Sequence, residues 1–177
     1  VLPEQRTRLT DEEVIARCPW ATTGRTHHRT PNIITSLELD PAEMEKRNIH
    51  LQKKYAEIEE NEVRFEELHC EDAEYLIVAF GSCARIAQKA MEIAREEGIK
   101  VGLLRPITLW PFPSKAIAAR AAQVKGILTV ELNAGQMVED VRLAVECKVP
   151  VEHFGRLGGI VPDPDEVITA LKEKLIK

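Results

Sequence analysis

Tyr75-Leu-Ile-Val-Ala-Phe80 is an unbroken apolar run, and a segment with helically spaced apolar residues follows it directly. A strand that is apolar at every position is typical of a parallel sheet covered by helices on both faces. Further apolar runs begin at Val101, Ile127 and Val151, and each is again followed by a helical segment. The pattern predicts an α/β fold, a three-layer α/β/α sandwich with a mainly parallel sheet and right-handed crossovers.

Cap and turn residues mark the ends of the predicted helices. Ser82 is the expected N-cap of the first helix, and Gly98 lies just past its end. Asp163-Pro-Asp-Glu166 is a capping box that begins the last helix. A fifth strand, at an edge of the sheet, is expected either from the linker before Tyr75 or from residues 107–109, and its direction stays open.

The chain is organised differently upstream of residue 73. Residues 1–39 are polar and contain three prolines, and Thr22–His28 has neither a helical nor a strand period, so we expect an extended arm. Asp40-Pro-Ala-Glu43 supplies an N-cap, a proline at the first helical position and an acid, which predicts a long linker helix over 40–72. The α/β domain is then expected to occupy 73–177.

The predicted linker helix has one narrow apolar stripe on an otherwise charged surface. The stripe consists of Met44, Leu51, Tyr55, Ile58 and Phe65. So thin a stripe usually lies against a neighbouring surface. That surface is either the chain's own α/β domain, or another subunit or a domain preceding this sequence, and the two interpretations are equally supported.

Composition excludes several classes of protein. The net charge of -5 argues against nucleic-acid and anionic-membrane binding, because such partners require a basic surface. No apolar run approaches the roughly 20 residues that cross a bilayer, and no secretory signal pattern is present. We therefore expect a cytoplasmic protein. The sequence begins Val1-Leu2 without Met, from which we expect an upstream portion and an incomplete active site.

The cysteines and histidines offer no metal or catalytic site. Cys18, Cys70, Cys83 and Cys147 are far apart and include no C-x-x-C pair, so we expect neither a metal ion nor an iron-sulfur cluster, and interpret them as reduced thiols. Cys83 at a helix start is the one candidate for a reactive thiol, because a helix dipole lowers a thiol pKa. No histidine is given a role, and no catalytic residue is assigned.

Candidate partner-facing or ligand-facing residues lie in the loops expected at the carboxyl ends of the strands, where ligands of such sheets gather. They are Ser82, Arg105, Trp110, Glu131, Asn133, Gly135, Gln136 and Arg156.

Two of these loops have a geometry that can receive an anion. Phe80–Cys83 and Asn133–Gln136 each place backbone N–H groups at a helix start. The glycine spacing matches no nucleotide fingerprint, and ordinary turns explain each glycine. Glu131 and Asn133 end an apolar strand, where they either face a cleft or cap the next helix, with capping by Asn133 weighted equally.

Two segments exceed what a generic strand–helix unit requires. They are Leu103-Leu-Arg-Pro-Ile-Thr-Leu-Trp-Pro-Phe-Pro113 and Val130-Glu-Leu-Asn-Ala-Gly-Gln-Met-Val-Glu-Asp-Val-Arg142. Together with Gly81-Ser-Cys-Ala-Arg85 and Phe154-Gly-Arg-Leu-Gly-Gly159, they resemble the α subunit of 2-oxoacid:ferredoxin oxidoreductases, in its transketolase-C-terminal-like domain and in the 2-oxoisovalerate/2-oxoglutarate branch. Leu39–Asn48 is similar to the family's linker, more loosely.

The resemblance implies an enzyme that converts a 2-oxoacid, CoA and oxidised ferredoxin to acyl-CoA, CO2 and reduced ferredoxin. It implies thiamine diphosphate, Mg²⁺ and iron-sulfur clusters in the complete enzyme, and none in this chain. The implied partners are an N-terminal pyrimidine-binding domain, a β subunit and a ferredoxin-like subunit. The chain would be an assembly domain that is inert alone. The alternative is a stand-alone module that binds CoA or another phosphate-bearing molecule.

Overall fold

The computed structural model describes residues 8–20 and 35–176. The chain forms two compact units, residues 1–47 and 48–177. The aperiodic stretch Thr22–His28 on which the extended arm was predicted lies outside the described residues.

The first unit contains a short helix where the sequence predicted only an extended arm. Helix α1 spans Asp11–Arg17 and begins with a reciprocal capping box: Glu13 N donates to Thr10 Oγ1, and Thr10 N donates to the Glu13 carboxylate. These two bonds satisfy N–H groups that a helix start otherwise leaves unpaired, so a seven-residue helix forms within a polar segment. Residues 11–17 of the predicted extended arm are therefore helical.

Helix α2 spans Pro41–Asn61 and starts where the sequence predicted. Asp40 Oδ1 accepts hydrogen bonds from Ala42 N at 2.8 Å and Glu43 N at 3.2 Å, which confirms Asp40 as the cap. The helix ends well before residue 72. After a three-residue connection, strand β1 occupies Phe65–Leu68, so Phe65 belongs to the sheet and not to the helical stripe.

The sheet has five strands in the order β1-β3-β2-β4-β5. Strands β2 (Tyr75–Ala79), β3 (Val101–Pro106), β4 (Gly126–Glu131) and β5 (Val151–Gly155) are parallel to one another, as predicted. Strand β1 is the expected fifth strand. It comes from the linker and runs antiparallel to β3.

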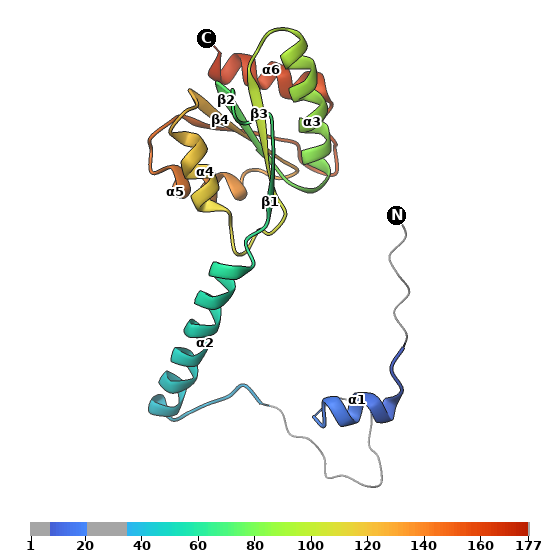
Figure 1. Cartoon of the computed structure of the whole chain (residues 1–177), viewed down its shortest axis with the longest axis vertical. Coiled ribbons are helices and arrows are strands. Elements are labelled where there is room, and N and C mark those ends of the chain that lie inside the picture. Colours follow the sequence, from blue (N-terminus) through green and yellow to red (C-terminus); the bar gives the residue numbers. More distant parts are fainter. Residues whose placement is uncertain (1–7, 21–34, 177) are drawn as a thin grey trace. The chain divides into compact units, whose positions relative to one another are not determined.

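Helices cover both faces of this sheet, which confirms the three-layer α/β/α sandwich (Figure 1). Helices α3 (Gly81–Glu96) and α6 (Pro164–Leu175) lie together on one face, and α4 (Ser114–Ala121) and α5 (Met137–Val145) lie together on the other. Each face has its own apolar core. Strand residues such as Leu128 face the first pair of helices, and neighbours such as Ile127 face the second. This two-sided burial is the physical reason for the unbroken apolar strands.

The ends of α3 and α6 agree with the sequence at two of the three positions predicted for these helices. Asp163 forms a capping box with Glu166, and Gly98 follows α3 with φ of +87°, a conformation that glycine adopts without strain. Ser82 is not a cap. The N-cap of α3 is Phe80, because the helix already begins at Gly81 directly after the strand.

Within residues 8–20 and 35–176, no helix is both long enough and apolar enough to span a membrane.

Candidate functional site

The carboxyl ends of the parallel strands lie at one end of the sheet, and β4 ends there in a buried acid. Glu131 is only 1% exposed, and Thr129, two residues earlier, is fully buried. Among the residues that the structure describes, these are the only two polar side chains in the buried class. A buried charge is costly unless it is hydrogen-bonded, so the partners of Glu131 decide what it does.

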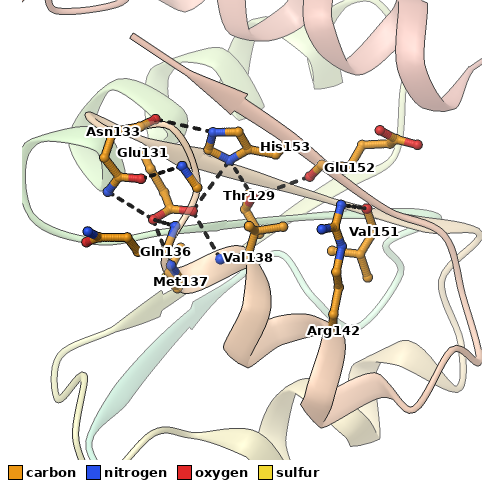
Figure 2. Close-up of polar contacts among 11 residues, drawn as sticks. Thr129, Glu131, Asn133, Gln136, Met137, Val138, Arg142, Val151, Glu152 and His153 are labelled. Atoms are coloured by element: carbon orange, nitrogen blue, oxygen red, sulfur yellow. Dashed lines mark hydrogen bonds and ion pairs between the residues drawn. The ribbon is translucent and has the colours of Figure 1, made fainter. Parts of the chain in front are cut away.

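The carboxylate of Glu131 binds the amino end of helix α5 (Figure 2). Its Oε2 accepts hydrogen bonds from Met137 N at 2.8 Å, Gln136 N at 3.3 Å and Asn133 Nδ2 at 3.1 Å. Its Oε1 accepts one from Val138 N at 3.1 Å. A negative charge on unpaired N–H groups at a helix start is doubly favourable, through hydrogen bonding and through the helix dipole.

Asn133 shapes the turn before α5 but does not cap the helix. Its Oδ1 accepts a hydrogen bond from Gly135 N at 2.7 Å, while its amide group donates to Glu131. Gly135 has φ of +111°. Of the two capping candidates considered from the sequence, Glu131 therefore takes this role. The predicted anion-receptive start of α5 is occupied by the chain's own carboxylate.

His153 on β5 completes the cluster, although no histidine was assigned a role from the sequence. Its Nδ1 lies 3.4 Å from Glu131 Oε1 and 3.2 Å from Thr129 Oγ1. Its Nε2 lies 3.3 Å from the carbonyl oxygen of Asn133. The imidazole thus links β5 to the end of β4 and to the loop that follows β4 (Figure 2). His153 can be recognised as a member of the cluster only from its pairing with Thr129, and that pairing is known only once the sheet register is known.

Gly155 permits the close approach of this loop to β5. A β-carbon on Gly155 would lie 2.2 Å from the Asn133 carbonyl oxygen and 2.6 Å from His153 Nε2. No side chain fits at such distances, so the position accepts glycine alone. We refer to Thr129, Glu131, Asn133, His153 and Gly155 as the Glu131 cluster.

The loop after β3 is fixed to the linker at the start of β1. Ile107 N and Thr108 N both donate to the Arg64 carbonyl oxygen, and Arg64 N donates to Thr108 Oγ1 at 3.0 Å. Trp110, in the same loop, has 55% of its surface exposed. Its ring makes an edge-to-face contact with Tyr55 of α2, with ring centroids 5.6 Å apart. One member of the α2 stripe therefore packs on the chain's own domain.

The remaining predicted residues lie apart from one another near the carboxyl ends of the strands. Arg105 pairs with Glu66 of β1 at 3.0 Å, and its buried Nε has no hydrogen-bond partner. Arg156 pairs with Glu166 of α6 at 2.9 Å, and Ser82 is exposed in the first turn of α3. Among the described residues, no hydrogen bond or ion pair joins Ser82, Arg105 or Trp110 to the Glu131 cluster.

Cys83 is not an activated thiol. It is buried at 3% exposure in the first turn of α3. Burial raises the pKa of the Cys83 thiol, and the negative charge of Glu131 raises it further. The sequence-based suggestion of a lowered pKa at this helix start was wrong, because desolvation and a nearby carboxylate favour the protonated thiol.

The Glu131 cluster is therefore suited to holding a loop in one conformation. The carboxylate already accepts four hydrogen bonds from its own chain. Across the described part of the chain, no three His, Cys, Asp or Glu side chains come together as metal ligands do.

Gly135→Val is expected to lower the free energy of unfolding by roughly 1–3 kcal/mol, the usual cost of a residue held in a rarely adopted backbone conformation. Its β-carbon would also lie 3.1 Å from Val138 Cγ1. Chemical denaturation measures the loss. Ala134→Val, at the exposed neighbouring position, is the control and should change stability far less. Equal losses in both variants would contradict the prediction.

Comparison with known proteins identifies the family of this chain. Residues 73–167 match the family model described as pyruvate:ferredoxin oxidoreductase core domain II. The ketoisovalerate oxidoreductase subunit VorB of Methanothermobacter thermautotrophicus is 46% identical over 165 residues, a match that covers 92% of this chain and 46% of VorB. The chain thus spans about half the length of this relative.

Two solved structures share the fold. A 2-oxoglutarate:ferredoxin oxidoreductase from Magnetococcus marinus, with 2-oxoglutarate, coenzyme A and succinyl-CoA bound, has a TM-score of 0.65 at 25% identity, over 77% of this chain and 24% of that one. A split-gene transketolase, described as an inactive beta4 tetramer, has a TM-score of 0.55 at 20% identity, over 64% of this chain and 41% of that one, and shows the fold alone.

The family match and the relatives define the class as a domain of 2-oxoacid oxidoreductases, and its fold is transketolase-like. Since the family model covers more than half of the sequence, the chain belongs to the pyruvate:ferredoxin oxidoreductase core domain II family.

Proposed function

We propose that this chain is the assembly domain of the α subunit of a 2-oxoacid:ferredoxin oxidoreductase, and that it is inert alone. The complete enzyme would convert a 2-oxoacid, CoA and oxidised ferredoxin to acyl-CoA, CO2 and reduced ferredoxin. The 46% identity to VorB favours 2-oxoisovalerate as the substrate. The observation that carries the proposal is the bonding of Glu131: the one buried acid of the described chain is committed to the domain's own backbone.

An exposed apolar surface supports the assembly role. Beside Trp110, the side chains of Ile107 and Leu109 are 50% and 47% exposed, and Tyr55 is 39% exposed. We call these four residues the Trp110 surface. Aromatic residues on rigid supports are frequent anchors of protein interfaces, and this loop is rigidly bonded to the linker. We propose that it contacts the pyrimidine-binding domain of the same subunit or the β subunit, and that residues 73–177 with the preceding linker act together.

The cofactors of the complete enzyme are proposed to lie outside this chain. Thiamine diphosphate with Mg²⁺ requires free oxygen ligands and an unoccupied diphosphate cradle. The start of α5 does not fit that group, because Glu131 already accepts its N–H groups. The described cysteines are unpaired and separated. Free thiols are usual in a reducing compartment, which supports a proposed cytoplasmic location.

A module for CoA or another phosphate-bearing molecule is not favoured, because Glu131 occupies the start of α5, one of the two helix starts predicted to receive an anion. Titration calorimetry of the chain with CoA, and separately with thiamine diphosphate, tests the distinction. We expect no micromolar binding of either molecule to the chain alone. Micromolar binding of either would overturn the assembly proposal.

Trp110→Ala is expected to weaken assembly more than folding. The loss of an interface anchor costs about 2 kcal/mol or more of binding, whereas the loss of the Tyr55 contact costs about 1 kcal/mol of folding. Subunit affinity and the melting temperature of the isolated chain measure the two effects. Leu143→Ala removes another exposed apolar side chain, from α5, and serves as the control. Similar losses of binding in both variants would refute the role of Trp110.

A further inference from the structure

Strand β5 forms one edge of the sheet and pairs only with β4. All five of its residues are half-buried. A strand at a sheet edge presents unpaired backbone N–H and C=O groups to any chain that lies alongside it.

The bonding of β5 shows which groups face outward. Ile127 N donates to the Pro150 carbonyl oxygen, and Arg156 N donates to the Glu131 carbonyl oxygen. Backbone groups along a strand alternate between its two sides. The backbone N–H and C=O groups of Glu152 and Phe154 therefore point toward β4.

It follows that Val151, His153 and Gly155 direct their backbone groups away from the sheet. The Val151 carbonyl oxygen accepts a hydrogen bond from Arg142 Nη2 at 3.3 Å, on the α5 side (Figure 2).

A groove lies on each side of this edge. On the α5 side, near the start of β5, a groove of about 430 Å³ is lined by apolar residues and by Arg142 and Lys148. On the α6 side, near the end of β5, a groove of about 480 Å³ includes Phe154. Side chains of an added strand alternate between the two faces of the sheet, so one strand beside β5 would reach both grooves.

The two grooves carry opposite charge. The α5-side groove has two cations and no acid in its lining. The α6-side groove has one cation, Lys174, and the carboxylates of Asp163, Asp165, Glu166 and Glu173. An occupant with basic side chains toward α6 and apolar or acidic ones toward α5 complements this edge.

A second copy of β5 does not satisfy that requirement. In a twofold antiparallel pair centred on His153, Glu152 of the second copy lies opposite Phe154, on the α6 side. Its carboxylate then meets the acidic groove, and like charges in such proximity oppose binding.

We infer that β5 receives an extended segment of another subunit of the oxidoreductase, which adds a sixth strand to the sheet and directs Lys or Arg side chains into the α6-side groove. This inference rests on the proposed function. Backbone hydrogen bonds would provide part of the affinity, and the two grooves would provide the selectivity.

Amide hydrogen exchange tests it, measured on the chain alone and on the chain assembled with the other subunits. We expect the Val151, His153 and Gly155 amides to exchange at least tenfold more slowly in the assembly. The Glu152 and Phe154 amides should be protected in both samples.

A charge reversal provides the second measurement. Glu173→Lys in the α6-side groove should weaken subunit affinity at least tenfold. Glu96→Lys is the matched control, because Glu96 is likewise exposed near the end of a helix, α3, and should leave affinity unchanged.

Unchanged exchange of the three outward amides in an assembled, active enzyme would overturn the inference and leave the proposed function standing. Protection that appears in the chain alone as its concentration rises would assign the edge to a second copy, and would also overturn it. Failure of the chain to assemble with any such subunit would refute the proposed function and this inference together.

Discussion

Glu131→Gln lowers the free energy of unfolding by about 3 kcal/mol or more, the expected cost of removing a buried charge that accepts several hydrogen bonds. The variant keeps the size of the side chain. However, one of its two acceptor oxygens becomes an NH2 group, which would face N–H donors. The start of α5 then loses both hydrogen bonds and the negative charge that its dipole favours.

Urea or guanidinium denaturation measures this loss, and the local effect appears as faster amide exchange at Met137 and Val138. Glu152→Gln is the matched control, because Glu152 lies on the adjacent strand and is only half-buried. It should change stability by about 0.5 kcal/mol or less. A stable Glu131→Gln variant with unchanged exchange at α5 would show that the carboxylate is dispensable.

Gly155→Ala is expected to destabilise the chain by about 3 kcal/mol, in the range for overpacking a well-ordered site. The added β-carbon would be 2.2 Å from a backbone oxygen, that of Asn133, and a backbone group cannot move aside as a side chain can. The loop must shift, which separates Asn133 from His153. Thermal and chemical unfolding measure the loss.

Gly126→Ala separates this clash from the general effect of adding a methyl group to a strand glycine. Gly126 also lies in a paired strand, but its β-carbon would meet the end of the Leu175 side chain at 2.8 Å, which can rotate away. We expect a loss of about 1 kcal/mol. Equal losses at both glycines would show that the Asn133 loop is free to move.

The layered fold could be predicted because the parallel strands and the helix starts are recognisable from short stretches of the sequence. Continuous apolar runs such as Tyr75–Ala79 reflect burial on two faces, and Asp40 and Asp163 cap the helices that follow them. These signals depend on neighbours in sequence. The antiparallel strand β1 was harder to predict, because Phe65–Leu68 is short and half polar and gains its hydrogen bonds only from β3.

The Glu131 cluster could be predicted only in part. The position of Glu131 at the end of an apolar strand pointed to either a cleft or a capped helix, and the structure shows the cap. His153 could not be found in this way. Its contacts come from the alignment of β5 with β4, and that register is a property of the folded sheet and not of the residues around His153.

The antiparallel pairing of β1 has a consequence for how this domain can be cut and fused. Because Phe65–Leu68 shields the outer side of β3, a truncated chain that begins at Ala73 would leave β3 as a bare border strand prone to self-association. We propose that the autonomous folding unit starts no later than Arg64, whose backbone also anchors the Thr108 loop. Gene fusions and splits that preserve solubility should therefore fall upstream of that residue.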